Sequence, residues 1–288
     1  MCIRDSYTVL PTPRVITVTS DSEDGEGVAD TGDKVTITGE NFGTDPSDIS
    51  VSFNGTPAEF ELVDESTIVA TTPADYQTGS VTVTIHGYTM TGGAMFNPNS
   101  KGDVTVLYLQ NYKQPFAKAN DESWKNGEWW TPAVWNQNAA SFNAKGNTTV
   151  SGMQYKSEEG LTLAFQNGWD KEAYTNGKMW QVATLRPGKY RLEVTYAYTL
   201  VVTDAGNFIS VLIAKGDSES DIPNVADLEQ LNGVYVAYDK MGTANDSGTL
   251  VTPSFEVTET TDVVIGFLTS LAKGNSYFKV TELKLILE

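Results

Sequence analysis

Residues 32–43 read GDKVTITGENFG, and this stretch decides the fold of the first part of the chain. Apolar Val35 and Ile37 alternate with threonines, which is typical of a strand that buries one face. The letters NFG that end the stretch are a turn signal. Further alternating runs, separated by turn-forming residues, occupy residues 50–53, 67–70 and 80–85. This spacing predicts a small all-β sandwich over residues 7–98.

A second region of alternating runs follows the polar segment NPNSKGD at residues 97–103. Its main runs occupy residues 190–198, 208–213, 263–267 and 277–285. One face of the first run carries residues that we expect in a core: Tyr190, Leu192, Val194, Tyr196 and Tyr198. Residues 222–231 predict one short helical turn, and the sequence indicates no long helix. The pattern predicts a linker at 99–105 and then a larger, jelly-roll-like antiparallel β-sandwich over residues 106–288.

All six tryptophans of the chain lie between residues 124 and 180, interleaved with asparagines and glutamines. Flat apolar rings beside neutral amides suit a ligand with C–H patches and many hydroxyls, and carbohydrate is the commonest such ligand. The turn signals NG and TP near residues 124–132 predict a surface loop, so we expect at least one solvent-facing ring there. The candidate ligand-binding residues are Trp129, Trp130, Trp124, Trp135, Trp169, Asn136, Gln137 and Asn167.

A structural role is the alternative for each tryptophan, because a chain of 288 residues needs aromatic bulk to fill its cores. Trp180 is ambiguous by position. Strand alternation places Met179, Gln181 and Leu185 on one face and Trp180 on the other, so the sequence leaves open which face is buried.

The formal charge of −18 is spread unevenly along the chain. Residues 1–98 hold 3 basic and 15 acidic groups, whereas residues 99–288 hold 16 basic and 22 acidic groups. Proteins that bind nucleic acids combine their stacking aromatics with a basic groove, and no basic stripe is present here. The composition therefore argues against a nucleic-acid partner and favours an uncharged ligand.

The stretch at residues 32–43, followed by VSFNG at 51–55 and TTP at 71–73, closely resembles the immunoglobulin-like TIG domain, also called IPT. The resemblance implies a spacer or interaction module. In it, Gly39 and Gly43 would let the chain turn where a Cβ would clash, and Phe42 would plug the end of the sandwich.

The second region carries several ordered motifs: NGKMWQ at 176–181, LRPGKYRLEV at 185–194, LIAKG at 212–216, IPNV at 222–225 and YFKV at 277–280. They resemble an uncharacterised C-terminal domain of Bacteroidota outer-membrane lipoproteins of the SusE and SusF kind. The resemblance spans about residues 106–288. It implies a carbohydrate-binding-module-like sandwich on a stalk, tethered to the cell surface by lipid and encoded beside polysaccharide importers. The importer components would then be partners.

Residues 1–6, MCIRDS, resemble the translation of a transposase adapter used in sequencing libraries, and we exclude them from the fold. Cys2 would then not be native, which removes disulfides and thiol chemistry from consideration. An export signal or lipid-anchor cysteine would precede the sequence given. No run reaches 18 apolar residues, so we expect membrane attachment only through such an anchor.

Catalytic chemistry is weakly supported. His86 is the single histidine and follows the outward phase of its strand, so we expect a solvent-facing structural residue. A glycosidase needs two carboxylates at a suitable separation, and four acids lie near the tryptophans: Glu122, Glu128, Asp170 and Glu172. Most acids on such a chain are solvated surface charges. We expect no enzyme activity and no cofactor, with structural calcium at residues 21–26 or at Asp217, Glu219 and Asp221 as a minority hypothesis.

The leading hypothesis is therefore a cell-surface glycan-binding protein with an immunoglobulin-like stalk. The alternative is a structural or adhesive surface protein whose tryptophans fill cores or interfaces. A glycoside hydrolase or its accessory protein is the third possibility. Exposure of the tryptophan rings discriminates between the first two.

Overall fold

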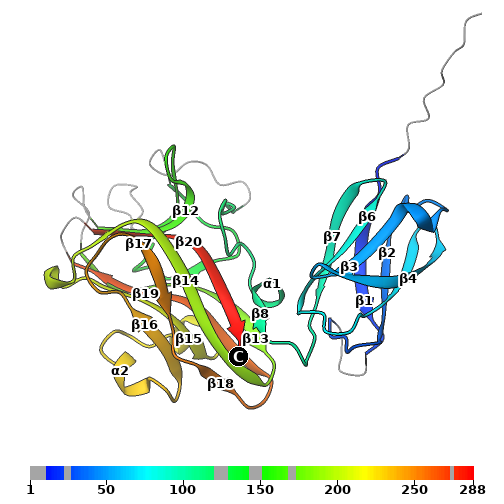
Figure 1. The fold of residues 1–288 in the computed structure, drawn as a ribbon. Helices are drawn as coiled ribbons and strands as arrows, with labels where there is room; N and C mark the ends of the chain where they lie inside the picture. Colours follow the sequence, from blue (N-terminus) through cyan, green and yellow to red (C-terminus); the bar gives the residue numbers. More distant parts are fainter. Residues whose placement is uncertain (1–10, 23–26, 120–128, 143–150, 168–172, 273–275) are drawn as a thin grey trace, which may run out of the picture. The chain divides into compact units, whose positions relative to one another are not determined.

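The computed structural model describes residues 11–22, 27–119, 129–142, 151–167, 173–272 and 276–288 (Figure 1). The chain divides into two compact units, residues 1–107 and 108–288. Both units consist almost entirely of antiparallel strands, which confirms the all-β prediction. None of the helices in the described part of the chain has the length and apolar character needed to cross a membrane.

The first unit is a sandwich whose strands follow the order β1-β2-β5-β4-β3-β6-β7. Their bounds are β1 Arg14–Ser20, β2 Lys34–Glu40, β3 Ile49–Phe53, β4 Thr56–Asp64, β5 Thr67–Thr71, β6 Gly79–Ile85 and β7 Tyr88–Met95, with the 3-10 turn η1 at Pro46–Asp48. Val35 and Ile37 are fully buried, as their alternation predicts. They pack with Phe53 and Tyr76 in one apolar core.

Gly39 is required by a close approach inside this unit. A Cβ there would lie 2.2 Å from the Arg14 backbone oxygen and 2.3 Å from the Phe42 ring. Phe42 is buried, and Gly43 adopts a φ of 80° that favours glycine. The predicted clash is therefore confirmed at Gly39, whereas Gly43 is favoured by its positive φ, since a Cβ there would meet nothing within 4 Å.

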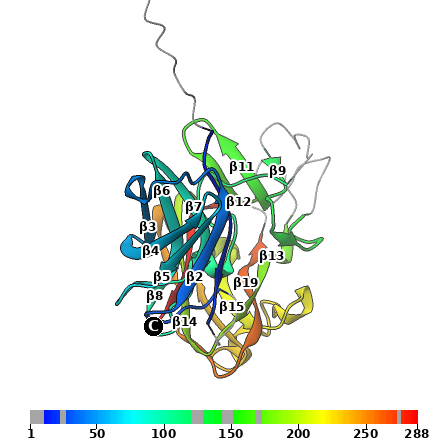
Figure 2. The same cartoon turned by 90° about the vertical axis from the view of Figure 1, so that its right-hand side faces the viewer.

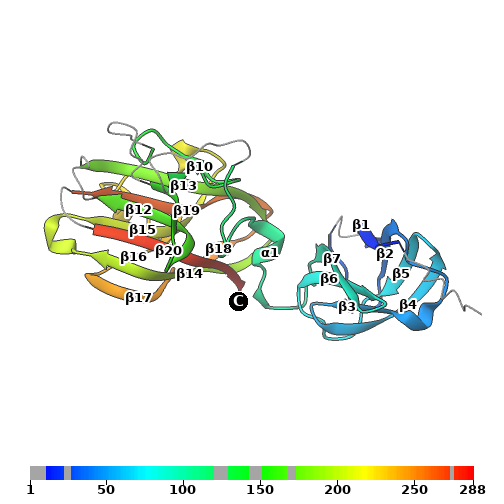
Figure 3. The same ribbon diagram turned by 90° about the horizontal axis from the view of Figure 1, so that it is seen from above.

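The second unit contains two facing sheets (Figures 1 and 3). The five-strand sheet has the order β10-β13-β19-β15-β16, and the larger sheet has the order β17-β14-β20-β12-β11-β9, with β18 also paired to β14. Strand bounds are β9 Trp129–Trp130, β10 Asn136–Gln137, β11 Ser151–Lys156, β12 Gly160–Asn167, β13 Tyr174–Leu185, β14 Gly188–Val201, β15 Phe208–Lys215, β16 Val236–Lys240, β17 Ala244–Val251, β18 Phe255–Val257, β19 Thr261–Leu271 and β20 Ser276–Leu287. The short elements are β8 Gly102–Asp103, α1 Thr105–Tyr108, η2 Thr203–Ala205, η3 Glu219–Asp221 and α2 Leu228–Leu231.

The main core of the second unit lies between its two sheets. The Phe267 ring centroid is 4.9 Å from that of Phe165 and 6.3 Å from that of Phe278. Tyr190 is buried as predicted, but Tyr198 is exposed because a bulge between Tyr196 and Thr199 shifts the alternation. The prediction that Tyr198 lies in the core is therefore wrong, since one extra residue reverses the face of the next side chain.

A second apolar cluster covers the outer face of the five-strand sheet. Trp180 packs there with Leu212, Val264 and Leu268, beneath the segment that carries Ile222 and Leu228. Both faces of β13 are thus buried around Trp180, which explains why alternation alone could not place this residue.

Candidate functional site

The tryptophan-rich residues 129–137, here called the closing segment, join the two sheets of the second unit along one edge. Trp129 and Trp130 form β9 and pair with Gln154 and Met153 of β11 (Figure 2). Asn136 and Gln137 form β10 and pair with Trp180 and Met179 of β13 (Figure 3). β9 and β10 are the edge strands of their sheets, so the closing segment crosses from one sheet to the other.

Three of the predicted stacking rings are buried in this edge. The exposed fractions are 4% for Trp129, 8% for Trp130 and 5% for Trp135. The Trp135 Nε1 donates to the Asn111 carbonyl at 3.0 Å, and its ring centroid lies 5.7 Å from that of Phe267. Expecting open ring faces at these three positions was wrong. Adjacent strand residues point to opposite faces, so the Trp129 and Trp130 rings cover the two faces of β9, whereas Trp135 lies just before β10. Trp124 and Trp169 lie outside the described residues.

The predicted amide residues fall into three different environments. Asn136 is exposed on β10. Gln137 bridges the two sheets, because its Nε2 donates to the Ser151 Oγ at 3.0 Å. Asn167 is fully buried, and its Nδ2 donates to the Leu271 carbonyl at 3.1 Å. Asn167 therefore links the end of β12 to the end of β19, which corrects its assignment as an open ligand-binding residue.

A pair of buried polar residues lies beside Trp129 on the outer face of the larger sheet. Leu163 and Phe165 face the core, so Thr162 points outward, and register places Gln154 directly opposite Thr162. Gln154 is also the partner of Trp129 in β9. We call Gln154 and Thr162 the polar pair. Neither residue is among the candidates that the tryptophan cluster suggests.

The polar pair carries two buried oxygens without a hydrogen-bond partner among the described residues, the Gln154 Oε1 and the Thr162 Oγ1. The Oε1 of Gln137, in the closing segment, is in the same state. Leaving a buried polar group unsatisfied costs roughly 1–3 kcal/mol, and such atoms are few in native proteins. Three such atoms on β10, β11 and β12 concentrate unsatisfied polar groups near this edge of the second unit.

The charge near the polar pair is balanced. Lys279 lies opposite Ala164, on the same outer face as Thr162, and forms a buried ion pair with Glu159. Its Nζ lies 5.4 Å from the centroid of the Tyr277 ring. A paired lysine and carboxylate leave little net field, so this part of the sheet suits an uncharged ligand better than an ion.

A second polar cluster surrounds the buried Lys178 on β13. The Lys178 Nζ donates to the backbone carbonyls of Glu219 at 3.1 Å and Ile222 at 2.6 Å. Burial lowers the pKa of Lys178, and the neighbouring Glu219 opposes this shift. The Glu219 Oε1 accepts from the Asn138 Nδ2 at 3.2 Å. These contacts hold the segment after β15 against β13, which is a structural role.

The acidic residues considered for calcium have separate hydrogen-bond partners. The Asp221 Oδ2 accepts from the Ser218 Oγ and from the Asp217 backbone nitrogen, and these bonds lower the pKa of Asp221. Within the described ranges no group of three or more His, Cys, Asp or Glu could hold a metal ion. Calcium at Asp217, Glu219 and Asp221 is therefore not supported. Residues 23–26 of the other acidic run, and Glu122, Glu128, Asp170 and Glu172, lie outside the described residues.

Comparison with known proteins finds a family model that matches within each unit. Residues 110–266 match the domain of unknown function DUF5013, and residues 25–100 match the IPT/TIG domain. The chain belongs to the DUF5013 family. No curated protein matches the chain. The closing segment, the polar pair and the Lys178 cluster all lie within the DUF5013 match.

Three solved structures are among those that match the chain. TmCBM61 in complex with β-1,4-galactotriose is 11% identical, with a TM-score of 0.33 over 62% of this chain and 100% of that chain. SGBP-B from a xyloglucan utilization locus in Bacteroides uniformis is 15% identical, with a TM-score of 0.27 over 96% and 73%. The K3 cleaved adhesin domain of Lys-gingipain from Porphyromonas gingivalis is 11% identical, with a TM-score of 0.32 over 62% and 97%. At these scores the likenesses carry no functional weight.

Proposed function

We propose that this chain is a non-catalytic glycan-binding protein whose DUF5013 sandwich carries the binding site and whose IPT/TIG domain is a spacer. The observation that supports the proposal most directly is the polar pair. Gln154 and Thr162 present buried, unsatisfied oxygens beside Trp129. Sugar hydroxyls both donate and accept, so they would satisfy these atoms if they reached them.

The proposed ligand is a neutral polysaccharide. The nearby charges are paired, and residues 99–288 carry a net charge of only −6. Individual sites of this kind gain strength when several are tethered on one surface. The resemblance to SusE- and SusF-like lipoproteins supports a location on the outer membrane through a lipid anchor, with glycan-importer components as partners.

Affinity electrophoresis against soluble plant, host and microbial polysaccharides tests this proposal. The wild-type chain should be retarded by at least one glycan. Thr162→Val keeps the shape of the side chain and removes the unpaired oxygen, so it should weaken binding about tenfold while leaving stability unchanged or slightly higher. Gln154→Met should act in the same direction.

Thr269→Val is the matched control. Thr269 is equally buried, but its Oγ1 donates to the Gly177 carbonyl at 3.2 Å and contacts the Tyr174 hydroxyl at 3.0 Å. This variant should lose about 1 kcal/mol of stability and keep its glycan affinity. Absence of retardation by every polysaccharide would reject glycan binding. Unchanged binding by Thr162→Val and Gln154→Met would reject the polar pair as the site.

A structural or adhesive protein is the second candidate, and the burial of three tryptophans favours it. In that case the closing segment only seals the sandwich, and the unsatisfied oxygens lower the stability of the fold without binding a ligand. Both polar-pair variants would then raise the free energy of unfolding, and no glycan would bind.

A further inference from the structure

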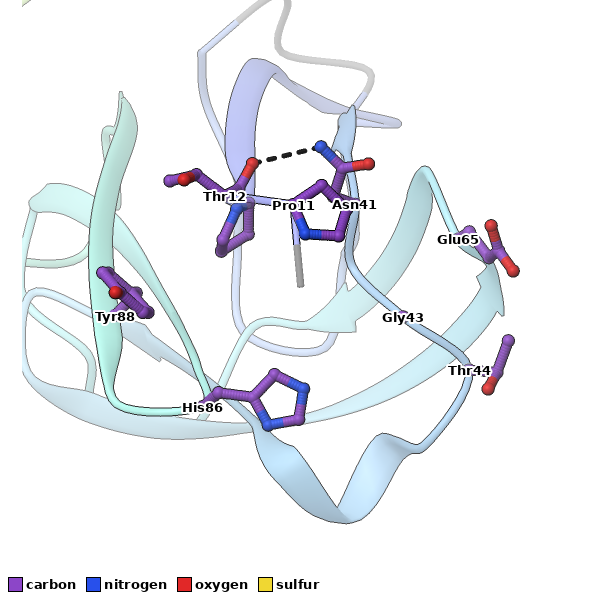
Figure 4. Close-up of a pocket in the computed structure, with 9 residues that line it drawn as sticks. Pro11, Thr12, Asn41, Gly43, Thr44, Glu65, His86 and Tyr88 are labelled. Carbon is purple, nitrogen blue, oxygen red and sulfur yellow. Dashed lines mark hydrogen bonds between the residues drawn. The ribbon is translucent and has the colours of Figure 1, made fainter. Parts of the chain in front are cut away.

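The first unit contains a depression with a volume of 310 Å³ at one end of its sandwich (Figure 4). Four separate parts of the chain line it: the residues before β1, the loop after β2, the β4–β5 turn and the β6–β7 hairpin. This volume lies at the lower end of the range for ligand cavities, about 300–1,000 Å³. It suits a small ligand such as one or two sugar units.

Tyr88 supplies an aromatic wall to this depression. Tyr88 is the first residue of β7. Its side chain is 62% exposed, which is more than that of Tyr155 or Tyr198 in the second unit. Figure 4 shows its ring at the side of the space that separates it from Asn41 and Glu65. An exposed ring of this kind can stack on a sugar face, which the buried Trp129, Trp130 and Trp135 cannot do.

His86 is held in position by Asp48. The His86 backbone nitrogen donates to the Asp48 carbonyl at 3.2 Å, and the His86 Nδ1 lies 3.4 Å from the Asp48 Oδ2. This contact fixes the imidazole from the Nδ1 side and directs the opposite ring edge, with the Nε2, away from Asp48. In Figure 4 the ring extends into the space below Asn41.

Asn41 supplies an amide on the facing wall. Its backbone has a φ of 60°, and its Nδ2 donates to the Thr12 carbonyl at 3.1 Å, shown as the dashed line in Figure 4. The internal bond uses one of the two amide N–H donors and leaves the Oδ1 as an acceptor. The His86 Nε2 and the Asn41 Oδ1 are thus two polar atoms that ligand hydroxyls could bind by hydrogen bonds.

The charge of this depression disfavours anions. Its lining, all within the described residues, includes the carboxylate of Glu65 and no lysine or arginine. The surrounding residues 1–98 carry 3 basic and 15 acidic groups. A ligand with phosphate, sulfate or carboxylate groups would be repelled, whereas a neutral sugar would not.

We propose that the IPT/TIG domain binds a neutral mono- or disaccharide in this depression. The sugar stacks on Tyr88 and forms hydrogen bonds with the His86 Nε2, the Asn41 Oδ1 and the Glu65 carboxylate. The domain then acts as a second, independent glycan contact as well as a spacer. A single shallow site of this size binds weakly, and the avidity of a two-site chain exceeds either affinity alone.

The sequence provides separate probes for the two units. His86 is the only histidine, and all six tryptophans lie between residues 124 and 180. Imidazole NMR signals of the full chain, produced without a histidine tag and labelled on histidine, report only on this depression. Tryptophan fluorescence of the same sample reports only on the DUF5013 sandwich.

The full chain is titrated at constant pH with D-glucose, D-galactose, D-xylose and cellobiose up to about 50 mM. At least one sugar should shift the His86 signals saturably, and Tyr88→Ala should weaken that binding at least tenfold without unfolding the protein, because the ring is exposed. Tyr155→Ala is the matched control in the other unit and should leave the His86 titration unchanged. Unsaturated or absent shifts with all four sugars, or equal binding by Tyr88→Ala, would overturn the proposal. Failure of the polar-pair site would appear only in the tryptophan signal.

Discussion

The closing segment of the second unit and the Tyr88 depression of the first unit both contain aromatic residues. These residues are buried in the closing segment and exposed in the depression. Trp129, Trp130 and Trp135 are 4–8% exposed, whereas Tyr88 is 62% exposed. The region richest in aromatic residues therefore seals an edge between two sheets. The exposed ring lies instead in the domain that the sequence marks as a spacer. Aromatic density along a sequence reports apolar bulk, and only the position relative to a sheet edge decides whether a face is open.

The largest expected effect separates the two aromatic states. Trp135→Ala removes a buried ring and its hydrogen bond to Asn111, so it should lower the free energy of unfolding by about 3–5 kcal/mol. Tyr88→Ala should change it by less than about 0.5 kcal/mol. Urea denaturation of both variants measures the difference. Similar losses in the two variants would remove the contrast between a structural and an exposed aromatic.

The same contrast applies to the amides of the second unit, with a smaller effect. Asn167→Ala deletes the buried hydrogen bond to the Leu271 carbonyl and leaves that carbonyl with one donor fewer, so a loss of about 1–3 kcal/mol is expected. Asn136→Ala, at an exposed position, should be nearly neutral. Thermal unfolding followed by circular dichroism compares them. A neutral Asn167→Ala would reject its role as a link between the sheets.

The smallest effect is expected at the exposed ion pair of Arg14 and Glu40 in the first unit. The two side chains are 3.0 Å apart, but both are more than half exposed. Solvent and salt screen such pairs, so Arg14→Ala should cost about 0–1 kcal/mol, with the difference disappearing in 1 M NaCl. Chemical denaturation at low and high salt tests this. A larger, salt-independent loss would show that exposure is a poor guide to energetic weight in this chain.

Much of the fold follows from local pattern. Alternation correctly buries Val35, Ile37 and Tyr190, and the glycine-containing turn around Phe42 forms as expected. The pattern fails at Tyr198, where a bulge shifts the phase, and at Trp180, where both faces of a central strand are covered. Bulges and second layers depend on partner strands, which a single run of residues does not encode.

The candidate sites were less predictable than the fold. Gln154 and Thr162 have no unusual sequence context, and only the pairing of β9, β11 and β12 brings them beside Trp129. A search for polar residues that alternate with apolar residues on strands near a sheet edge could have suggested them. The Tyr88 depression combines four segments spread between Pro11 and Tyr88, and the hairpin turn at His86 was the only local signal.

The sequence by itself determined that this protein is an all-β chain with two sandwiches, because a two-residue period and turn-forming residues are local properties of the backbone. The scarcity of basic residues also argued against a nucleic-acid partner. Only the tertiary structure decided which aromatic faces are open. Exposure depends on what packs against each side of a strand, and here those neighbours come from distant parts of the chain.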